Sequence, residues 1–258
     1  MKKKLIAFDM DGTLAESKSP LDDRMVAALD RLLEKFHVCI ISGGKFDLFQ
    51  RQLLSSLHAE PAKLQHLHLM PTCGTRYYKF SAVDNDWQLV YAEDLAASEK
   101  KRISGVLNEA LDALGYREKK TWGEVIEDRG SQITVSTLGQ DVVTVLGLEG
   151  VKRKEVWDPD NEKKKKIRAY AAERLPEFEV RVGGLTSVDV TKPGIDKAYG
   201  MQKLMDMLKI EKDEILFMGD RLVEGGNDYP VKAMGIDSIE VSHWRDTALA
   251  VEVINHVA

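Results

Sequence analysis

The chain has 258 residues, of which 43% are hydrophobic and 31% are charged, and its formal net charge at pH 7 is -5. These proportions are those of an ordinary globular protein, and they show no basic excess of the kind that marks a dedicated nucleic-acid partner. The length allows one large domain or a core with a smaller insert, and no stretch approaches the roughly 18 apolar residues of a membrane span.

The first ninety residues alternate strand and helix patterns. A short apolar run ends at Asp9, which indicates a buried strand. In chain order, the predicted elements are a strand at 5–8, a helix at about 22–35, a strand at 38–41, a helix at 47–57, a short strand after 68–70, and a hairpin of 77–80 with 87–91. Such alternation predicts a parallel sheet covered by helices.

The middle of the chain has a different pattern. Ile133 and Val135 alternate on one face of a predicted strand, and a long helical spacing precedes them. The predicted elements are a helix at 95–114, strands at 124–128, 132–138 and 151–157, a helix ending at Leu175, and a strand at 178–182. This mixture indicates a small α+β unit with an antiparallel sheet.

After Gly183 and Gly184 the first pattern returns. The predicted elements are strands at 187–190, 215–218 and 236–241, with helices at 197–208 and 247–257. The fold class is therefore α/β, with a doubly wound, mainly parallel sheet as its core. We expect residues 1–90 and 187–258 to form this core, and residues 91–186 to form an inserted α+β cap.

Asp9, Asp11 and Gly12 form the first candidate site, directly after a predicted strand. Ligands of open α/β sheets bind at the carboxyl ends of strands, and Gly12 permits the turn that brings both carboxylates to one pocket. Asp9 would then attack phosphorus, while Asp11 protonates the leaving oxygen and later deprotonates water. A plain strand-to-loop turn is the competing interpretation, because Asp and Gly are common in turns.

Two further segments carry groups that suit a phosphate. Ser42, followed by Gly43, offers a hydroxyl and backbone N–H groups to phosphate oxygens. A helix N-cap is the commoner role of such a serine. Lys197 would place a positive charge beside a phosphoryl group, and its alternative role is that of an ordinary surface lysine.

An acidic loop follows the penultimate predicted strand. Mg²⁺ prefers oxygen ligands, and the carboxylates of Asp9 and Asp220 with the backbone carbonyl of Asp11 could supply them. Asn227 and Asp228 return to the same loop, where they could orient waters or the candidate lysine. Taken alone, an acidic, glycine-rich surface loop explains this segment equally well.

These four segments, in this order, resemble the haloacid dehalogenase-like phosphohydrolase superfamily over the whole chain. The insert between the serine and lysine segments looks like the C2 cap of the IIB group. Within that group the chain is most similar to the eukaryotic-type phosphomannomutase branch. The residues that carry this similarity are 9–14, 129–136, 138–139, 183–184, Ser187, Asp189, Lys197, 219–220 and 225–228.

The resemblance implies that Arg129 in the cap, and Ser187 and Asp189 at the return to the core, bind the sugar or its phosphate. Because Arg129 follows Glu127 and Asp128, a local salt bridge or turn contact is the alternative role of this arginine. Lys18 and Gln140 stand where that branch has arginines. Arginine offers a bidentate fork to phosphate, which neither lysine nor glutamine replaces fully. A mutase must hold a second phosphate, so this difference weakens the mutase hypothesis more than the phosphatase hypothesis.

Hydrolysis of a sugar phosphate or a similar small phosphoester, through an aspartyl-phosphate and with Mg²⁺, is therefore the leading hypothesis. A phosphomannomutase, which interconverts mannose 1-phosphate and mannose 6-phosphate, is the alternative, and a binding protein without catalysis is a remote third. We expect no nucleic-acid or membrane partner, and the resemblance implies a homodimer through the cap. Cys39 and Cys73 lack the CxxC spacing of a metal site, and such thiols suit a reducing cytoplasm.

Overall fold

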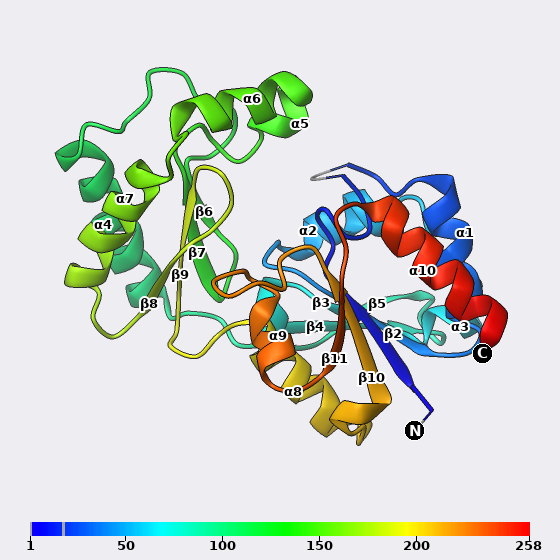
Figure 1. Ribbon diagram of the computed structural model, residues 1–258. Helices are drawn as coiled ribbons and strands as arrows, with labels where there is room; N and C mark the ends of the chain where they lie inside the picture. Colours follow the sequence, from blue (N-terminus) through cyan, green and yellow to red (C-terminus); the bar gives the residue numbers. More distant parts are fainter. Residues whose placement is uncertain (1, 17–18) are drawn as a thin grey trace. The chain divides into compact units, whose positions relative to one another are not determined.

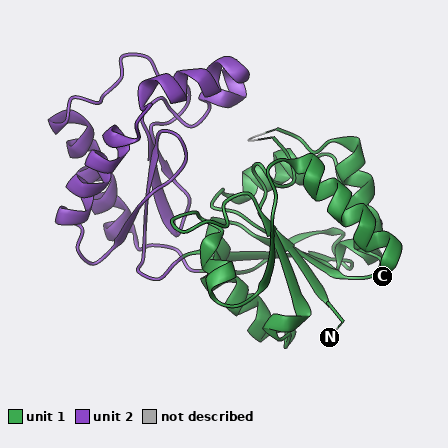
Figure 2. Cartoon of the chain, in the orientation of Figure 1, with its two compact units in different colours: residues 1–92, 196–258 green, residues 93–195 purple. Residues whose placement is uncertain are grey.

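The computed structural model describes residues 2–16 and 19–258, which form two compact units (Figure 1, Figure 2). The larger unit contains the chain up to Ala92 and again from Asp196 to Ala258, and the smaller unit contains Glu93–Ile195. Within the described residues, no helix is both long enough and apolar enough to cross a membrane.

Seven strands form the sheet of the larger unit, in the order β11-β10-β1-β2-β3-β4-β5. The first five strands of this order are parallel, and β4 and β5 return as an antiparallel hairpin. The bounds are β1 Leu5–Phe8, β2 His37–Ile41, β3 Leu67–Met70, β4 Arg76–Ser81, β5 Asp86–Ala92, β10 Ile215–Gly219 and β11 Asp237–Glu240. The sheet is thus mainly parallel, as the sequence predicts.

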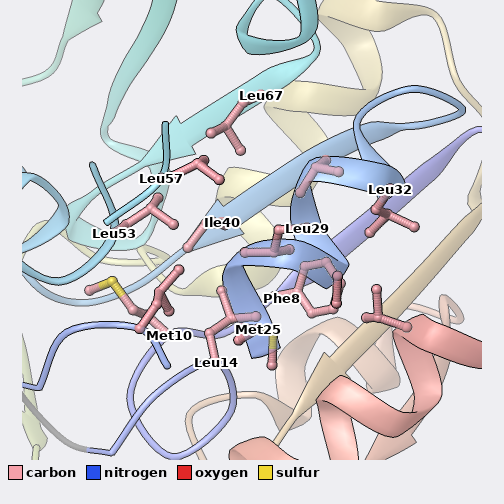
Figure 3. Close-up of a cluster of buried hydrophobic side chains, with 14 of the residues drawn as sticks. Phe8, Met10, Leu14, Met25, Leu29, Leu32, Ile40, Leu53, Leu57 and Leu67 are labelled. Atoms are coloured by element: carbon pink, nitrogen blue, oxygen red, sulfur yellow. The ribbon is translucent and has the colours of Figure 1, made fainter. Parts of the chain in front are cut away.

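Two long helices cover one face of this sheet. α1 (Asp23–Leu32) and α10 (Trp244–Val257) pack over a cluster that includes Phe8 and Ile40, both fully buried (Figure 3). Asp22 caps α1, because its carboxylate accepts a hydrogen bond from the Arg24 backbone N–H at 3.0 Å. The apolar residues of α1 recur at helical spacing, so one side of the helix is buried.

The opposite face is covered by α8 (Lys197–Leu208) and α9 (Tyr229–Ala233). Leu5 and Phe217 lie in the cluster beneath them and are fully buried. Helices on both faces make the sheet doubly wound. The shorter turns of this unit are α2 Phe46–Phe49, a π-helical turn at Gln50–Leu54, α3 Pro61–Leu64, and 3₁₀ turns at Thr72–Gly74 and Lys212–Glu214.

Four antiparallel strands form the sheet of the smaller unit, in the order β6-β7-β9-β8. α4 and α7 pack over one face, where Ile133 and Val190 are fully buried. The bounds are α4 Ala97–Ala113, β6 Ile126–Asp128, β7 Gln132–Ser136, α5 Val142–Leu146, α6 Leu148–Trp157, α7 Glu162–Arg174, β8 Glu179–Val182 and β9 Ser187–Thr191. The middle of the chain is therefore an α+β unit, as its pattern predicts.

Three predicted elements differ from the structure. The short strand predicted after residues 68–70 instead contains them, because β3 spans Leu67–Met70. The predicted strand at 151–157 is part of helix α6, in which Glu149 and Arg153 form an i,i+4 ion pair at 3.0 Å. The predicted strand at 187–190 was assigned to the core, but β9 pairs with β7 and β8 in the smaller unit. Its Val188 and Val190 join the apolar cluster of that unit, so the chain returns to the larger unit at Asp196 rather than at residue 187.

Candidate active site

Three parallel strands end in polar residues at one edge of the larger sheet. Asp9 directly follows β1, Ser42 directly follows β2, and Asp220 directly follows β10. The backbone N–H of Asp9 donates to the Met218 carbonyl at 3.0 Å, which continues the β1–β10 ladder by one residue. The carboxyl ends of neighbouring parallel strands therefore bring these side chains to one place.

Lys197 enters this edge from the first turn of α8. Asp196 starts the helix by accepting a hydrogen bond from the Tyr199 backbone N–H at 3.0 Å. The Lys197 side chain is 1% exposed, and its ammonium donates to Asp9 Oδ1 and, at 2.6 Å, to Asp228 Oδ1. The structure thus places Lys197 as a buried cation between two buried carboxylates, and not on the surface.

Burial sets the charges of this group. Burial raises the pKa of Asp9 to about 7, although the positive charge of Lys197 opposes the rise. Burial alone would lower the pKa of Lys197, but the negative charges of Asp9 and Asp228 raise it above its ordinary value. Lys197 therefore keeps its proton, and it compensates a carboxylate that burial alone would hold neutral.

Asp9, Asp220 and Asp228 form a group that could hold a metal ion. Each offers one carboxylate oxygen, and these oxygens lie within 4.8 Å of one another. Asp220 is half-buried, and burial followed by the charge of Asp228 raises its pKa. Carboxylate oxygens in such a cluster suit a hard divalent cation, which would relieve their mutual repulsion. The donor set therefore fits Mg²⁺.

Two glycines leave room for these carboxylates. A Cβ atom on Gly12, whose φ is +84°, would lie 2.9 Å from Asp220 Oδ2. A Cβ atom on Gly219 would lie 2.5 Å from Asp228 Oδ2. A side chain at either position would displace an aspartate, so both glycines are required by the packing of the acidic group.

Asp11 and Ser42 complete the catalytic set that the sequence predicts. Asp11 Oδ1 accepts a hydrogen bond from the Gln52 side-chain amide at 3.1 Å. Ser42 is 5% exposed, and its hydroxyl accepts from the Gly44 backbone N–H at 3.2 Å. Lys45, not Ser42, is the N-cap of α2, so the structure removes the helix-cap interpretation of Ser42.

The remaining predicted residues of the larger unit differ in their surroundings. Asp228 is fully buried, and its Oδ2 accepts from the Arg221 backbone N–H at 3.0 Å. Asn227 is exposed, and Gly43 is half-buried in the loop after β2. Lys18 lies outside the described residues.

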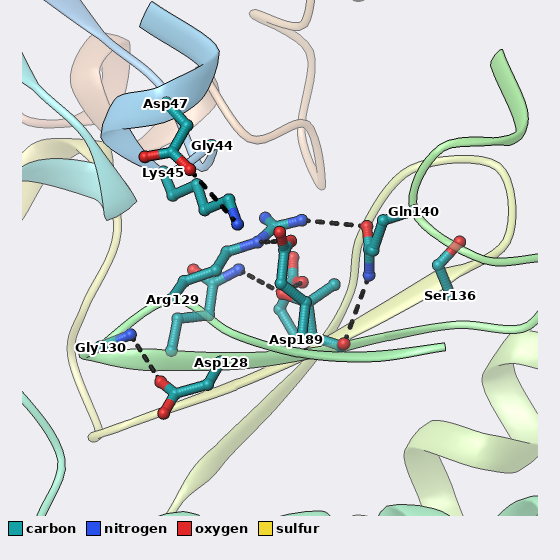
Figure 4. Close-up of polar contacts among 12 residues, drawn as sticks. Gly44, Lys45, Asp47, Asp128, Arg129, Gly130, Ser136, Gln140 and Asp189 are labelled. Carbon is teal, nitrogen blue, oxygen red and sulfur yellow. Dashed lines mark hydrogen bonds and ion pairs between the residues drawn. The ribbon is translucent and has the colours of Figure 1, made fainter. Parts of the chain in front are cut away.

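Arg129 and Gln140 contact each other in the smaller unit (Figure 4). Arg129 donates through Nε to Glu127 Oε2 at 2.7 Å and through Nη2 to Gln140 Oε1 at 3.3 Å. Asp189 pairs with Thr134 across β7 and β9, and its Oδ1 accepts from the Thr134 hydroxyl at 2.7 Å. The local ion pair that Arg129 can form with Glu127 is therefore present.

Ser187 begins β9 and pairs with Ser136 of β7. It lies two residues before Asp189, so both side chains belong to one face of the strand. A Cβ atom on Gly183 would lie 2.6 Å from Ser187 Oγ and 2.8 Å from Asp189 Oδ2, so the glycine before β9 approaches both side chains closely. The structure thus brings Ser187 and Asp189 together beside the turn between β8 and β9.

A family model of haloacid dehalogenase-like hydrolases matches residues 6–230. The chain belongs to this haloacid dehalogenase-like hydrolase family. It is therefore an enzyme that acts on phosphate esters. The match covers the β1 motif, the whole smaller unit, Lys197 and the acidic loop, which are the features that the geometry brings together.

Relatives of this haloacid dehalogenase-like enzyme include several phosphomannomutases. The phosphomannomutase of Encephalitozoon cuniculi is 24% identical over 253 residues, which cover 95% of this chain and 91% of that protein. The phosphomannomutase of Schizosaccharomyces pombe is 27% identical over 239 residues, which cover 89% of this chain and 85% of that protein. The similarity to the phosphomannomutase branch is thus confirmed over nearly the full chain.

Solved structures show the same fold. An IMP-nucleotidase from Plasmodium falciparum superposes with a TM-score of 0.69 at 17% identity, over 100% of this chain and 71% of that chain. A haloacid dehalogenase-like hydrolase from Bacteroides thetaiotaomicron superposes with a TM-score of 0.61 at 16% identity, over 98% and 100% of the two chains. At these identities the likeness concerns the fold alone.

The sequence did not reveal two polar contacts of this haloacid dehalogenase-like chain, those of Gln52 with Asp11 and of Thr134 with Asp189. Gln52 lies in a helical segment without a motif, so nothing singles out its contact with Asp11. The Glu127–Arg129 ion pair, in contrast, is the local salt bridge that their separation of two residues predicts. Thr134 occupies an ordinary strand position, and only the β7–β9 register shows that it faces Asp189.

Proposed function

We propose that this enzyme hydrolyses the phosphate ester of a sugar phosphate or a similar small metabolite, with Asp9 as the nucleophile. The observation that carries the proposal is the contact of Asp9 with Lys197 inside a buried group of carboxylates. An ordinary surface loop would not bury a lysine against two aspartates at the carboxyl edge of a sheet, because buried charges are costly. Such a group can stabilise the charge that develops on a transferring phosphoryl group.

The reaction proceeds in two balanced steps. A carboxylate oxygen of Asp9 attacks phosphorus, the bond from phosphorus to the ester oxygen breaks, and Asp11 gives its proton to that leaving oxygen. Asp11 then takes a proton from water as the water oxygen attacks the same phosphorus, and inorganic phosphate leaves Asp9. Ser42 and Lys197 hold the phosphoryl oxygens during both steps.

Asp9, Asp220 and the backbone carbonyl of Asp11 would hold Mg²⁺, and Asp228 belongs to the same acidic group. The bound ion would offset the negative charge of the phosphoryl oxygens. Lys197 already contacts Asp9 and Asp228, so this chain compensates part of the same charge with its own residue. We further propose that residues 93–195 act as the substrate-selecting cap, with Arg129, Gln140, Ser187 and Asp189 as its contacts.

A phosphomannomutase reaction is the second candidate. The named relatives support it better than they support hydrolysis. Two contacts of Arg129 support hydrolysis, because its guanidinium is paired with Glu127 and also donates to the uncharged Gln140. A second phosphate would need more positive charge than this pair offers. We therefore place hydrolysis first.

Phosphorus NMR separates the two candidates. The protein is incubated with Mg²⁺ and mannose 1-phosphate, with and without a hexose bisphosphate. Hydrolysis predicts inorganic phosphate, whereas a mutase predicts mannose 6-phosphate that depends on the bisphosphate. Gln140→Arg is the matched variant, and it should increase any mutase product. If neither inorganic phosphate nor an isomerised sugar phosphate forms from this substrate or from other hexose phosphates, both candidates are rejected.

A further inference from the structure

Gln52 is a buried amide beside the proton-transferring aspartate. It lies on the π-helical turn Gln50–Leu54 and is 1% exposed. Its Nε2 donates to Asp11 Oδ1 at 3.1 Å and to the Ser19 carbonyl at 3.0 Å. An amide nitrogen has two hydrogens, so both are used. π-Helical turns are rare and are often found at functional sites.

The two acceptors fix the orientation of this amide. If the Gln52 side chain were turned over, its oxygen would face the Asp11 carboxylate and the Ser19 carbonyl, and no hydrogen would lie between them. In the observed orientation, Oε1 is buried and has no hydrogen-bond partner among the described residues. A buried oxygen without a hydrogen-bond partner is unfavourable. This orientation nevertheless leaves both N–H groups of Gln52 hydrogen-bonded, one to Asp11 and one to the Ser19 carbonyl.

We propose that Gln52 is the positioning residue of the general acid Asp11. The N–H donor of Gln52 occupies a lone pair of Asp11 Oδ1 and so disfavours a proton on that oxygen. We therefore place the proton that Asp11 transfers on Oδ2, and the Ser19 carbonyl fixes the Gln52 amide that orients Asp11. This inference rests on the proposed hydrolysis through Asp9 and adds a residue to it.

Substrates whose leaving groups differ in their need for a proton can reveal the positioning role of Gln52. An alkyl phosphate such as glucose 6-phosphate releases a poor leaving oxygen, which needs the proton of Asp11 as its bond to phosphorus breaks. p-Nitrophenyl phosphate releases a stable phenolate, which leaves without a proton. Misplacing the proton should therefore slow phosphorylation of Asp9 by the first substrate and not by the second.

Gln52→Met tests the proposal, because methionine keeps the length of the side chain and removes both N–H donors. Single-turnover release of the alcohol or phenolate, with Mg²⁺, measures phosphorylation of Asp9 alone. We expect release from glucose 6-phosphate to slow by about 10-fold to 100-fold, and release from p-nitrophenyl phosphate to change by less than about 3-fold. Gln50→Met is the matched control, since Gln50 is exposed on the same turn and should leave both rates unchanged.

Equal slowing with both substrates would show that Gln52 only supports the fold, and no slowing with either would also overturn the proposal. If the methionine variant does not fold, Gln52→Glu gives the same comparison, because an ionised glutamate cannot donate to Asp11. A wild-type protein that releases neither product contradicts the proposed function itself. A wild-type protein that releases both, with equal slowing in the variant, contradicts only the role of Gln52.

Discussion

At the scale of single residues, Lys197 carries one positive charge between two buried carboxylates. Its ammonium contacts Asp9 and Asp228, and all three side chains are at most 5% exposed. Buried charges are costly unless they are paired, so each carboxylate depends on the lysine for its ionised state. The residue that would bind phosphate therefore also stabilises the charge of Asp9, the proposed nucleophile.

Asp9→Asn should abolish turnover and preserve the fold. Asparagine has nearly the same shape but cannot form the phosphorylated intermediate, so we expect the rate to fall by at least about 10³-fold. The unfolding free energy should stay the same or rise, because burial already disfavours the charge of Asp9. Steady-state phosphate release and urea unfolding measure the two quantities. Asp84→Asn, at the exposed β4–β5 turn, is the control, and activity of the Asp9 variant near that of the control would contradict the mechanism.

At the scale of elements, the turn Thr72–Gly74 contacts both the loop that contains Ser42 and helix α8, which begins at Lys197. Thr72, Cys73 and Gly74 all have positive φ angles, of 50°, 56° and 82°. Thr72 donates its backbone N–H to the Gly44 carbonyl, and Cys73 donates to the Ser42 carbonyl, each at 2.9 Å. Strained backbone of this kind persists only where the surroundings hold it. Gly74 also packs against Gly200 of α8, three residues after Lys197.

Gly200→Ala should destabilise the protein although alanine favours helices. The new Cβ atom would lie 2.6 Å from the Cys73 carbonyl oxygen and 3.0 Å from Gly74 Cα. We expect a loss of about 1–3 kcal/mol and lower activity, because α8 and Lys197 must move. Gly105→Ala in α4 is the matched control, since nothing lies near its Cβ position, and it should stabilise by up to about 1 kcal/mol. Equal effects of the two changes in urea unfolding would remove the proposed contact.

A hydrogen-bonded row of side chains crosses β2, β3 and β4. His68 lies inside β3, although the sequence predicted a strand only after residues 68–70, and it is fully buried. Its Nε2 lies 3.0 Å from His37 Nδ1, and its Nδ1 lies 2.7 Å from the Tyr77 hydroxyl. Burial, and then the charge of His37, lowers the pKa of His68 to about 3.

Acid should therefore destabilise the larger unit through His68. The unfolded chain binds a proton at this histidine below pH about 6.5, whereas the folded chain does not until pH about 3. Stability falls with falling pH across that window, by at most roughly 1.4 kcal/mol per pH unit. His68→Asn should flatten this dependence in urea unfolding at pH 7 and pH 5, whereas the exposed control His256→Asn should not. Parallel pH profiles for wild type and both variants would rule out His68 as the source.

At the scale of the whole molecule, the sequence predicts which strand ends lie at one edge of the sheet better than it predicts the partners of each strand. Asp9, Ser42 and Asp220 follow apolar runs, and the carboxyl ends of neighbouring parallel strands necessarily share an edge. β9 has an equally clear strand pattern, but alternation does not say which sheet a strand joins. Its place in the smaller unit depends on long-range pairing with β7 and β8.

Helix α6 and Gln52 show two other limits of the sequence. The segment from Val151 to Trp157 was predicted as a strand, but it is charged and belongs to a helix. Its short apolar pattern fits both a strand and a helix, so the sequence alone does not separate the two. Gln52 contacts a residue 41 positions away, and no local pattern encodes such a contact. Local spacing thus predicts elements and strand ends, whereas the polar contacts around Asp11 and Arg129 depend on the assembled fold.

The acidic group also joins the two chain segments of the larger unit. Asp9 comes from the segment before the insert, whereas Asp220 and Asp228 come from the segment after it. Their oxygens come together only when both segments are folded, so Mg²⁺ should bind the folded chain far better than the unfolded chain. Binding would then stabilise the whole unit by about 2.7 kcal/mol when the free ion exceeds its Kd about 100-fold.

Mg²⁺ should therefore raise the thermal midpoint of the wild-type protein over that measured in a chelator, by roughly 5–10 °C for a chain of this size. Asp220→Asn removes one ligand but leaves the Lys197 contacts of Asp9 and Asp228 in place, so it should lose most of this rise without unfolding the apoprotein. Asp84→Asn, far from the group in sequence and exposed, should keep the full rise. An equal rise in all three proteins would mean that the ion binds elsewhere, and the assignment of Asp220 as a ligand would then be wrong.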